Sequence, residues 1–427
     1  MSNKQWPKKK ISWLFDVIGS GTTPSASNGM YYNSPDIAWL NTGDLTDSYI
    51  EKTSKYVSQQ ALDEFSALTV FPKDSLVMAM YGATIGKLGI TKYETTTNQA
   101  CCVLSKPREV ITKFIFYWLM GHRTEIINLS QGGGQPNISQ GIIRDIKIAV
   151  PPVELQNKIV AFIDKEFEET NQLINKKEKM IKLLEQQRQS IITEAVTKGL
   201  NPNVKMKDSG VEWIGEIPEH FEKTLIKYIS DINMGQSPSS EDVNVLGDGL
   251  PFLQGNAEFG EFYPTPKLFS TSINKQSKLN DILLSVRAPV GAMNISNQIF
   301  GIGRGLCSIT PKIEMKFLWY WLIGYNEYLK SFSTGSTFEA ISIDDIKNFV
   351  ICVPEKNEQL EIVCFLDYKI GQIDNVKKQL KLQIQKLKEY RQSLIYEAVT
   401  GKIDVREMER EVSEVSEDGC GYIGEGV

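Results

Sequence analysis

The chain has 427 residues, more than one typical domain needs, and is long enough to bury two hydrophobic cores. Hydrophobic residues make up 41% and charged residues 23%, as in globular proteins, and its apolar runs are far shorter than the roughly 20 residues that span a bilayer. The composition argues against a membrane protein, and a formal net charge of −5 means that any nucleic-acid binding must depend on local patches.

The net charge is concentrated at the end of the chain. From Asp404 onward there are eight acidic and two basic residues, so the preceding residues hold 45 basic against 44 acidic ones. Residues 402–427 also lack hydrophobic periodicity, and we expect them to form an acidic, disordered tail.

The six cysteines form no C-x-x-C pair and have no metal-ligand spacing. The start of the chain is basic and is not followed by the apolar segment of a secretory signal. We therefore expect reduced thiols in a cytoplasmic protein.

Residues 1–152 predict a first mixed α/β domain. Strand-like segments such as IAWLNTGDL from Ile37 and SLVMAMYGATIG from Ser75 are separated by turn signals. They are followed by a short aromatic helix at Lys113–Met120 and by a glycine-rich loop, QGGGQPNIS, from Gln131. Strands that precede a buried helix are typical of an α+β arrangement.

A long helix is predicted at residues 153–198, because this segment contains no glycine or proline and keeps heptad spacing. Its end is marked by Gly199 and by the Asn201-Pro202 pair. Residues 199–212 then form a polar linker.

The second half of the chain repeats the first. Adding 203 to a residue number aligns the helical stretches without a gap, so that RQSIITEAVT from Arg188 matches RQSLIYEAVT from Arg391. We therefore expect a second domain at residues 213–355 and a second long helix at 356–401. The two globular halves differ much more in sequence than the two helices do.

Both long helices carry apolar residues at alternating spacings of four and three, which is typical of a coiled-coil seam. Basic residues interrupt this seam at Lys177, Arg188, Lys377 and Arg391, where their stems could pack while the charges reach solvent, or where they could fix the register. The seam is predicted to comprise Ile163, Phe167, Ile174, Ile181, Leu184, Ile191, Leu366, Ile370, Ile373, Leu380, Ile384, Leu387 and Leu394.

The sequence predicts no catalytic, metal or cofactor site. The segment GATIGK from Gly82 is one residue too short for a phosphate-binding loop and is followed by Leu88 instead of the required Ser or Thr. The glycines from Gly301 lack dinucleotide-binding spacing, and His122 and His220 have no nucleophile pattern, so we expect them to be surface or packing residues.

Polar, glycine-rich loops between the strands are the candidate DNA-binding positions, because amide, hydroxyl and guanidinium groups recognise base edges and phosphates. Arg287 is the strongest candidate, since it ends an apolar strand and can project from a rigid element. The candidates are Thr22, Thr23, Asn41, Thr42, Tyr81, Thr84, Lys87, Gln131, Gln135 and Asn137 in the first half, and Gln236, Ser237, Gln254, Asn256, Arg287, Arg304, Ser336 and Thr337 in the second.

Four features resemble the specificity subunit of a type I restriction–modification system, and they come in the same order in both halves except for the lead-in, which is found only in the second half. They are the lead-in KDSGVEWIGEIPEHFE from Lys207, the strand NDILLSVRAPVG from Asn280, a Gly/Ser/Thr loop followed by Ile-Ser, and VPxxxxQ at the start of each heptad helix. The resemblance covers about residues 6–402. The first half departs from it, because QWPKKKISWL lacks the W-I-G-E-I-P lead-in.

This resemblance implies two DNA-recognition domains joined by two long helices that form an antiparallel coiled coil. It also implies a subunit that recognises a bipartite, asymmetric sequence in double-stranded DNA without catalysing a reaction. Its partners would be two methyltransferase subunits and, for restriction, two ATP-driven restriction subunits. S-adenosylmethionine and ATP are therefore expected only on the partners, and the chain itself would hold no cofactor or metal.

The residues by themselves leave a second hypothesis open. Duplication and heptad repeats would equally suit a coiled-coil scaffold that binds only other proteins. The polar loops and the divergence of the globular halves favour DNA recognition.

Overall fold

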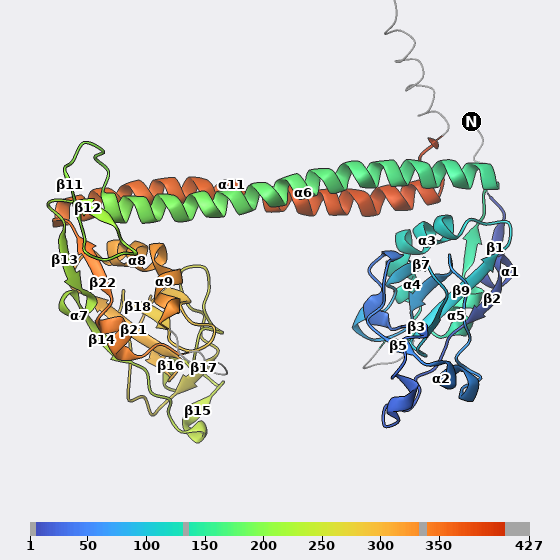
Figure 1. Ribbon diagram of the computed structural model, residues 1–427, viewed down its shortest axis with the longest axis horizontal. Helices are drawn as coiled ribbons and strands as arrows, with labels where there is room; N and C mark the ends of the chain where they lie inside the picture. Colours follow the sequence, from blue (N-terminus) through green and yellow to red (C-terminus); the bar gives the residue numbers. More distant parts are fainter. Residues whose placement is uncertain (1–5, 131–135, 333–339, 406–427) are drawn as a thin grey trace, which may run out of the picture. The chain divides into compact units, whose positions relative to one another are not determined.

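The computed structural model describes residues 6–130, 136–332 and 340–405, so almost all of the predicted acidic tail lies outside the described residues. The chain folds into two compact units, Met1–Lys177 with Leu382–Val427, and Glu178–Lys381. We call these the first and the second unit. Each contains one globular region and a part of both long helices (Figure 1).

Both globular regions mix helices and strands, and the two long helices are α6 (Val153–Lys198) and α11 (Lys356–Val399). The prediction of two mixed domains with two long helices is confirmed. Among the described residues, no helix combines the length and the apolar character that crossing a membrane requires.

The first unit contains strands on both sides of a buried aromatic helix in the sequence. Its elements are β1 (Lys8–Lys10), α1 (Ile11–Leu14), β2 (Phe15–Gly19), η1 (Gly29–Tyr31), β3 (Ile37–Leu40), η2 (Thr42–Asp44), β4 (Ser48–Ile50), β5 (Tyr56–Val57), α2 (Gln59–Glu64), β6 (Leu76–Ala79), η3 (Gly82–Thr84), β7 (Leu88–Thr91), β8 (Thr95–Thr97), β9 (Cys101–Pro107), α3 (Thr112–Gly121), α4 (Arg123–Ile127), α5 (Gln140–Asp145) and β10 (Lys147–Ala149).

The second unit follows the same plan after an additional hairpin. Its elements are β11 (Met206–Asp208), β12 (Glu216–Pro218), β13 (Glu222–Leu225), α7 (Ile226–Ile229), β14 (Ser230–Met234), η4 (Ser240–Asp242), β15 (Val243–Asn244), β16 (Leu250–Leu253), β17 (Leu268–Ser270), β18 (Ile282–Ser285), β19 (Met293–Ile295), β20 (Gly301–Ile302), β21 (Leu306–Pro311), α8 (Met315–Gly324), α9 (Asn326–Ser331), α10 (Ile343–Lys347) and β22 (Val350–Val353).

The sheets of the two units correspond except at their edges, where β4 and β15 have no counterpart. The first unit has a sheet in the order β2-β9-β6-β7-β4, and the second unit has β14-β21-β18-β19. A smaller sheet, β5-β3-β8, corresponds to β17-β16-β20 with β15 added at its edge. In both small sheets one pair is parallel, β3 with β8 and β16 with β20.

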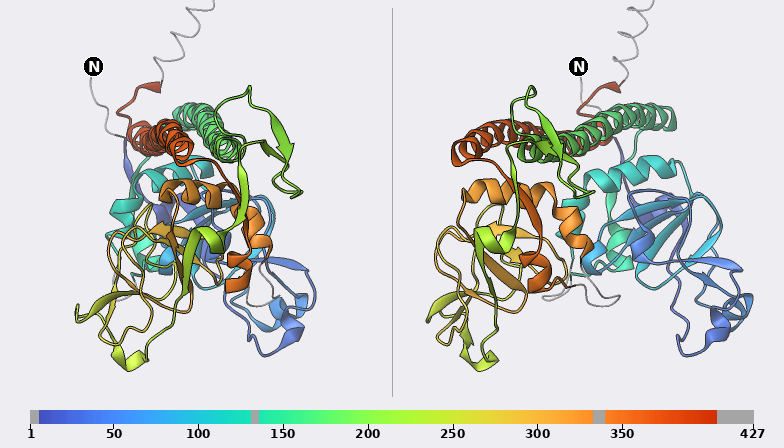
Figure 2. Two further views of the ribbon diagram at one scale, coloured as in Figure 1. Left: turned by 90° about the vertical axis from the view of Figure 1, so that its left-hand side faces the viewer. Right: turned by 60° about the vertical axis from the view of Figure 1, so that its left-hand side comes forward.

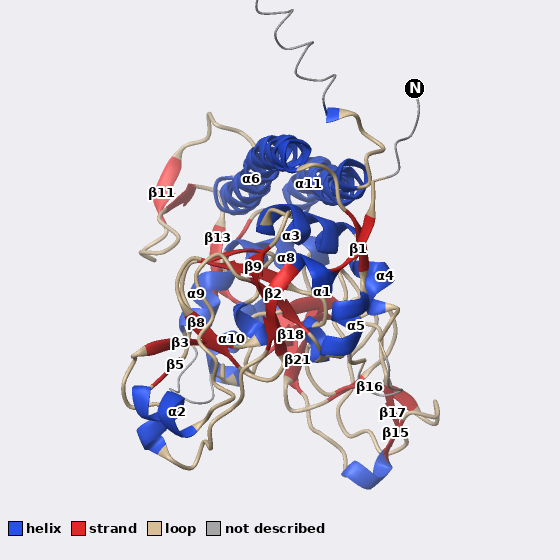
Figure 3. Ribbon diagram, turned by 90° about the vertical axis from the view of Figure 1, so that its right-hand side faces the viewer, coloured by secondary structure: helices blue, strands red, loops and turns tan. Residues whose placement is uncertain are grey.

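A short aromatic helix joins each sheet to the long helices. The α3 side chains from Phe114 to Met120 are all buried, because the sheet covers one side of the helix and α6 and α11 cover the other (Figures 2 and 3). In the second unit α8 holds the same place, and Trp321 is completely buried. Full burial of one such side chain contributes about 1.5–3 kcal/mol to the free energy of folding. Because several of these side chains are buried together, this layer is the main core of each unit.

A carboxylate on each long helix binds the aromatic helix below it. Asp164 accepts hydrogen bonds from Tyr117 and from Lys113, the latter at 2.7 Å. Asp367 accepts from Tyr320 at 2.7 Å and also from the corresponding lysine of α8. Burial, reinforced by the neighbouring carboxylate, raises the pKa of both tyrosines, so their hydroxyls remain protonated donors.

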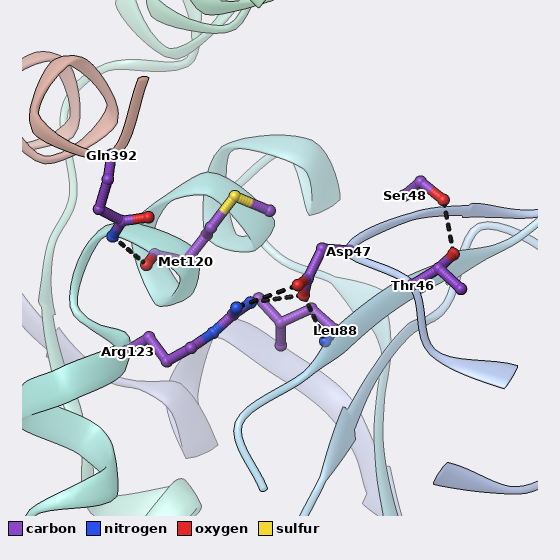
Figure 4. Close-up of polar contacts among 7 residues, drawn as sticks. All are labelled: Thr46, Asp47, Ser48, Leu88, Met120, Arg123 and Gln392. Carbon is purple, nitrogen blue, oxygen red and sulfur yellow. Dashed lines mark hydrogen bonds and ion pairs between the residues drawn. The ribbon is translucent and has the colours of Figure 1, made fainter. Parts of the chain in front are cut away.

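The opposite end of each aromatic helix is attached to the other long helix, which is α11 in the first unit and α6 in the second. The Nε2 of Gln392 donates to the Met120 carbonyl at 3.0 Å (Figure 4), and Gln189 donates to the Gly324 carbonyl at 2.8 Å in the second unit. In the first unit, Arg123 also donates to both carboxylate oxygens of Asp47, one of them at 3.0 Å. The aromatic helix of each unit is therefore fixed to both long helices.

The two long helices run antiparallel in each unit. In the first unit, Arg391 donates to Asn171 at 2.6 Å and Lys177 donates to Gln383 at 2.6 Å, so residue numbers rise along one helix as they fall along the other. In the second unit the same direction follows from two ion pairs, Lys377 with Glu185 at 3.3 Å and Arg188 with Asp374 at 3.7 Å. The antiparallel coiled coil is thus confirmed.

The predicted seam positions are all buried or half-buried. Ile163, Ile174, Leu366, Ile370, Ile373, Leu380, Ile384 and Leu394 are buried, and Phe167, Ile181, Leu184, Ile191 and Leu387 are half-buried. The basic residues between them make polar contacts across the seam. Such contacts favour one register of two helices over its alternatives.

A buried glutamine begins each long helix. Oε1 of Gln156 accepts from the Ile111 amide at 2.8 Å, and its Nε2 donates to the Pro151 carbonyl at 2.8 Å. Gln359 repeats both contacts, with the Glu314 amide at 3.0 Å and the Pro354 carbonyl at 2.9 Å. The side chain satisfies backbone groups that would otherwise be buried without a partner.

Substituting Gln156→Leu keeps the volume but leaves the Ile111 amide unpaired. We expect the free energy of unfolding of the first unit to fall by about 1–3 kcal/mol, measured by chemical denaturation of the full chain. Gln172 on the same helix is exposed and bonds only Glu168, so Gln172→Leu is the matched control and should change stability by less than about 0.5 kcal/mol. Equal effects of the two variants would contradict the assigned role.

Candidate nucleic-acid interface

Several strands of the first unit end at one edge. β3 and β8 are parallel and end together, while β2 and β6 both end beside the first residues of β9. The loops that follow these strands therefore lie close together. We call this region the first polar edge, and it comprises residues 20–25, 41–44, 80–87, 98–100 and 137–140.

Hydroxyl and amide groups form one part of the first polar edge. The hydroxyl of Thr23 donates to Oε1 of Gln99 at 2.7 Å, and Nδ2 of Asn98 donates to Oδ1 of Asn41 at 3.1 Å. Thr22 is half-buried, and its carbonyl accepts from a tryptophan of β3. Thr42, in η2, is also half-buried.

The remaining candidates of the first unit lie on two neighbouring loops. Tyr81 forms an isolated bridge with Asn137, which brings the loop after β6 against the segment before α5. Burial raises the pKa of the half-buried Tyr81, so its hydroxyl remains a hydrogen-bond donor. Thr84 is half-buried in η3, and Lys87 follows with an exposed side chain.

The second unit has an equivalent edge, the second polar edge, formed by residues 235–239, 254–256, 286–288 and 303–305. Gln236 and Gln254 are exposed there, and Asn256 is half-buried in the same loop as Gln254. The hydroxyl of Ser237 accepts from the Arg304 backbone amide at 3.2 Å. Close backbone contacts hold these loops together, since the Gly305 amide donates to the Gln254 carbonyl.

Two exposed arginines belong to the second polar edge. Arg287 lies two residues after the end of β18, and its backbone is fixed by a bridge to Ala340 and by a 2.9 Å hydrogen bond from Ser285 to its carbonyl. Arg304 lies between β20 and β21. Neither guanidinium has a hydrogen bond or an ion pair with any of the residues that the structure describes.

The candidate residues are therefore not scattered: those within the described part of the chain lie at one of the two edges. The two edges also match position by position: Thr22 with Gln236, Thr23 with Ser237, Asn41 with Gln254, and Tyr81 with Arg287. Four candidates, Gln131, Gln135, Ser336 and Thr337, lie outside the described residues.

The structure adds Asn98 and Gln99 to the candidates of the first polar edge. They are not among the predicted candidates, because TNQA from Thr97 carries no glycine or proline turn signal. Only the parallel pairing of β8 with β3 places Asn98 beside Asn41. The corresponding segment of the second half, GIGRG from Gly301, does carry glycine turn signals, and its Arg304 is one of the predicted candidates.

Both histidines are accounted for by packing and pairing. His122 is stacked on Trp118 with ring centroids 3.9 Å apart, and burial lowers its pKa. His220 pairs with Glu358 at 2.8 Å. Burial raises the pKa of Cys101 and of Cys102 to about 12, so these thiols are poor nucleophiles.

The two polar edges present hydrogen-bond donors and acceptors, and these are the groups that recognition of base edges requires.

The model of the type I restriction modification DNA specificity domain matches the chain twice, over residues 3–183 and 218–386. The chain is 36% identical to the specificity subunit assigned to the type I restriction enzyme MjaX of Methanocaldococcus jannaschii, covering 94% of this chain and 95% of that protein. It is 21% identical to the specificity subunit of type I restriction enzyme EcoBI of Escherichia coli, covering 92% and 86% of the two chains.

The fold is also similar to solved structures. A chain from a structure of a type I restriction–modification system matches with a TM-score of 0.73 at 22% identity, covering 94% of this chain and all of that chain. The HsdS subunit from Thermoanaerobacter tengcongensis matches with a TM-score of 0.51 at 22% identity, covering 94% and 98% of the chains.

The two matched regions define a duplicated DNA-specificity protein. The chain belongs to the family of type I restriction–modification specificity subunits. Membership supports the DNA-recognition hypothesis and not the alternative of a scaffold that binds only proteins.

Glycine is required where the loops of each polar edge touch. A Cβ on Gly235 would lie 2.1 Å from the Gly303 carbonyl oxygen, whereas one on Gly255, in the neighbouring loop, would meet nothing within 4 Å. Gly235→Ala should therefore push the loop outward, cost about 1–3 kcal/mol of stability and weaken DNA binding. Gly255→Ala is the control and should retain both thermal stability and affinity. A Gly235→Ala variant with unchanged melting temperature would refute the close contact.

Proposed function

We propose that the first and the second polar edge each recognise one half of a bipartite, asymmetric DNA sequence. The observation that carries this proposal is the duplicated edge, in which the same backbone frame presents different side chains in the two units. Different side chains on equivalent frames are what two unlike half-sites require. Base edges in the major groove can be distinguished by such amide, hydroxyl and guanidinium groups.

We further propose that the chain binds two methyltransferase subunits and, for restriction, two restriction subunits. The long helices support a partner present in two copies, because Leu173 of α6 and Val376 of α11 are related by the repeat and are 46% and 42% exposed. An exposed apolar residue at the same place on both helices suits two identical contacts. The chain would act in the cytoplasm, where chromosomal DNA is accessible.

The catalytic steps belong to the partners in this proposal. S-adenosylmethionine and ATP would bind to the methyltransferase and restriction subunits, and this chain would supply sequence recognition and assembly alone. The stacking of His122 on Trp118, the pairing of His220 with Glu358 and the raised pKa of the buried thiols support this division.

The purified chain alone should therefore not transfer methyl groups. We expect no incorporation of labelled methyl from S-adenosylmethionine into DNA, and full activity when a methyltransferase partner is added. Incorporation by the chain alone, after removal of any co-purified partner, would refute the division of labour.

A domain exchange tests the bipartite function directly. Residues 213–350 of this chain are replaced by the same region of a relative that has a different target, and methylated motifs are sequenced in cells that also express the methyltransferase partner. We expect one half of the motif to change and the other half to persist. The reciprocal exchange of residues 1–147 is the matched control and should change the other half only. A change in both halves after either exchange would contradict independent recognition.

A further inference from the structure

Backbone hydrogen bonds establish that Tyr81 and Arg287 occupy the same position in their units. Each lies two residues after a central strand of its sheet, β6 or β18, and each forms an isolated bridge to the segment before the last small helix, with Asn137 and Ala340 respectively. Asn137 and Ala340 are themselves related by the repeat of 203 residues.

Gln99 and Arg304 are equivalent for a similar reason. The residue before each donates its amide to the last residue of the parallel partner strand, Asn98 to Leu40 at 3.0 Å and Gly303 to Leu253 at 2.8 Å. Gln99 is hydrogen-bonded to Thr23, and Arg304 to the equivalent Ser237.

The two arginines are also neighbours of each other. The amide of Val286 donates to the Gly305 carbonyl at 2.9 Å, and these two residues flank Arg287 and Arg304 in the sequence. Both side chains are exposed, without a carboxylate partner among the residues that the structure describes. The second polar edge thus displays two adjacent free guanidinium groups, whereas the equivalent positions of the first carry a phenol and an amide.

Guanidinium and amide groups prefer different bases. A guanidinium donates two parallel hydrogen bonds to O6 and N7 of guanine, which offers only acceptors there. An Asn or Gln amide combines a donor and an acceptor, as does the adenine edge. The backbone positions of the two polar edges match, so we expect the different side chains to give the two units different base preferences.

We infer that the half-site bound by the second unit contains guanines recognised by Arg287 and Arg304, and that the half-site bound by the first unit is recognised by amide and hydroxyl groups without an arginine–guanine contact at the equivalent positions. This inference rests on the proposed function, and it adds which base each unit selects. The two guanidinium groups extend from neighbouring backbone segments, so they can contact two guanines within one half-site.

The test uses the full chain in complex with its methyltransferase partner and a DNA library randomised in both halves of the target. We expect guanine at the contacted positions of one half. Arg287→Ala and Arg304→Ala should each relax the preference at one position from guanine to any base, with a loss of roughly 5- to 150-fold against the original site, while the other half stays unchanged.

Two controls separate base recognition from phosphate binding. Lys312→Ala removes an exposed basic side chain at the other end of the same sheet, where it pairs with Asp231, and should leave the base preferences intact. DNA with 7-deazaguanine, which lacks the N7 acceptor, should weaken binding of the unmodified chain, and the arginine variant that contacts the position should lose no further affinity.

The inference is overturned if either arginine variant binds all sequences more weakly with unchanged preferences and a salt dependence smaller by about one unit, the result of a lost phosphate contact. It is equally overturned if the half-site of the second unit contains no guanine. In both cases the bipartite motif itself persists. A complex that selects no bipartite sequence would instead defeat the proposed function.

Discussion

The attachment of one aromatic helix to two long helices is the constraint on which each unit depends. Asp164 and Gln392 lie on different long helices, yet both bind α3. They can do so together only if the helices keep one register. The polar contact between Arg391 and Asn171 crosses the seam next to Gln392 and favours that register. The sheet rests on α3, so the positions of the loops at the polar edge follow from the pairing of the long helices.

The duplication carries this constraint into the second unit. Asp367 and Gln189 bind α8 as Asp164 and Gln392 bind α3. The helices therefore cannot vary independently of the globular regions, which explains why the repeat is most visible in them. At the polar edges, by contrast, the frame is made of backbone hydrogen bonds and glycine contacts. The side chains there are free to differ.

The sequence predicted the fold well, because its main signals are periodic. Heptads gave the long helices and the repeat gave the second domain, and the buried aromatic stretches gave α3 and α8. Asn98 and Gln99 could not be predicted, because their position depends on a parallel pairing between β3 and β8, which are far apart in the sequence. The exposure of Arg304 and its lack of a carboxylate partner among the described residues also depend on packing, and the sequence alone does not show them.

The backbone frame of the polar edges has a consequence for how such a protein can change over time. Val286 and Gly305 hold their loops through main-chain atoms, and Gly235 fits by having no side chain at all. A mutation of an exposed neighbour such as Arg304 therefore leaves these contacts in place. New target sequences can arise by single substitutions at little cost in stability, and one unit can acquire a new preference while the other keeps its own.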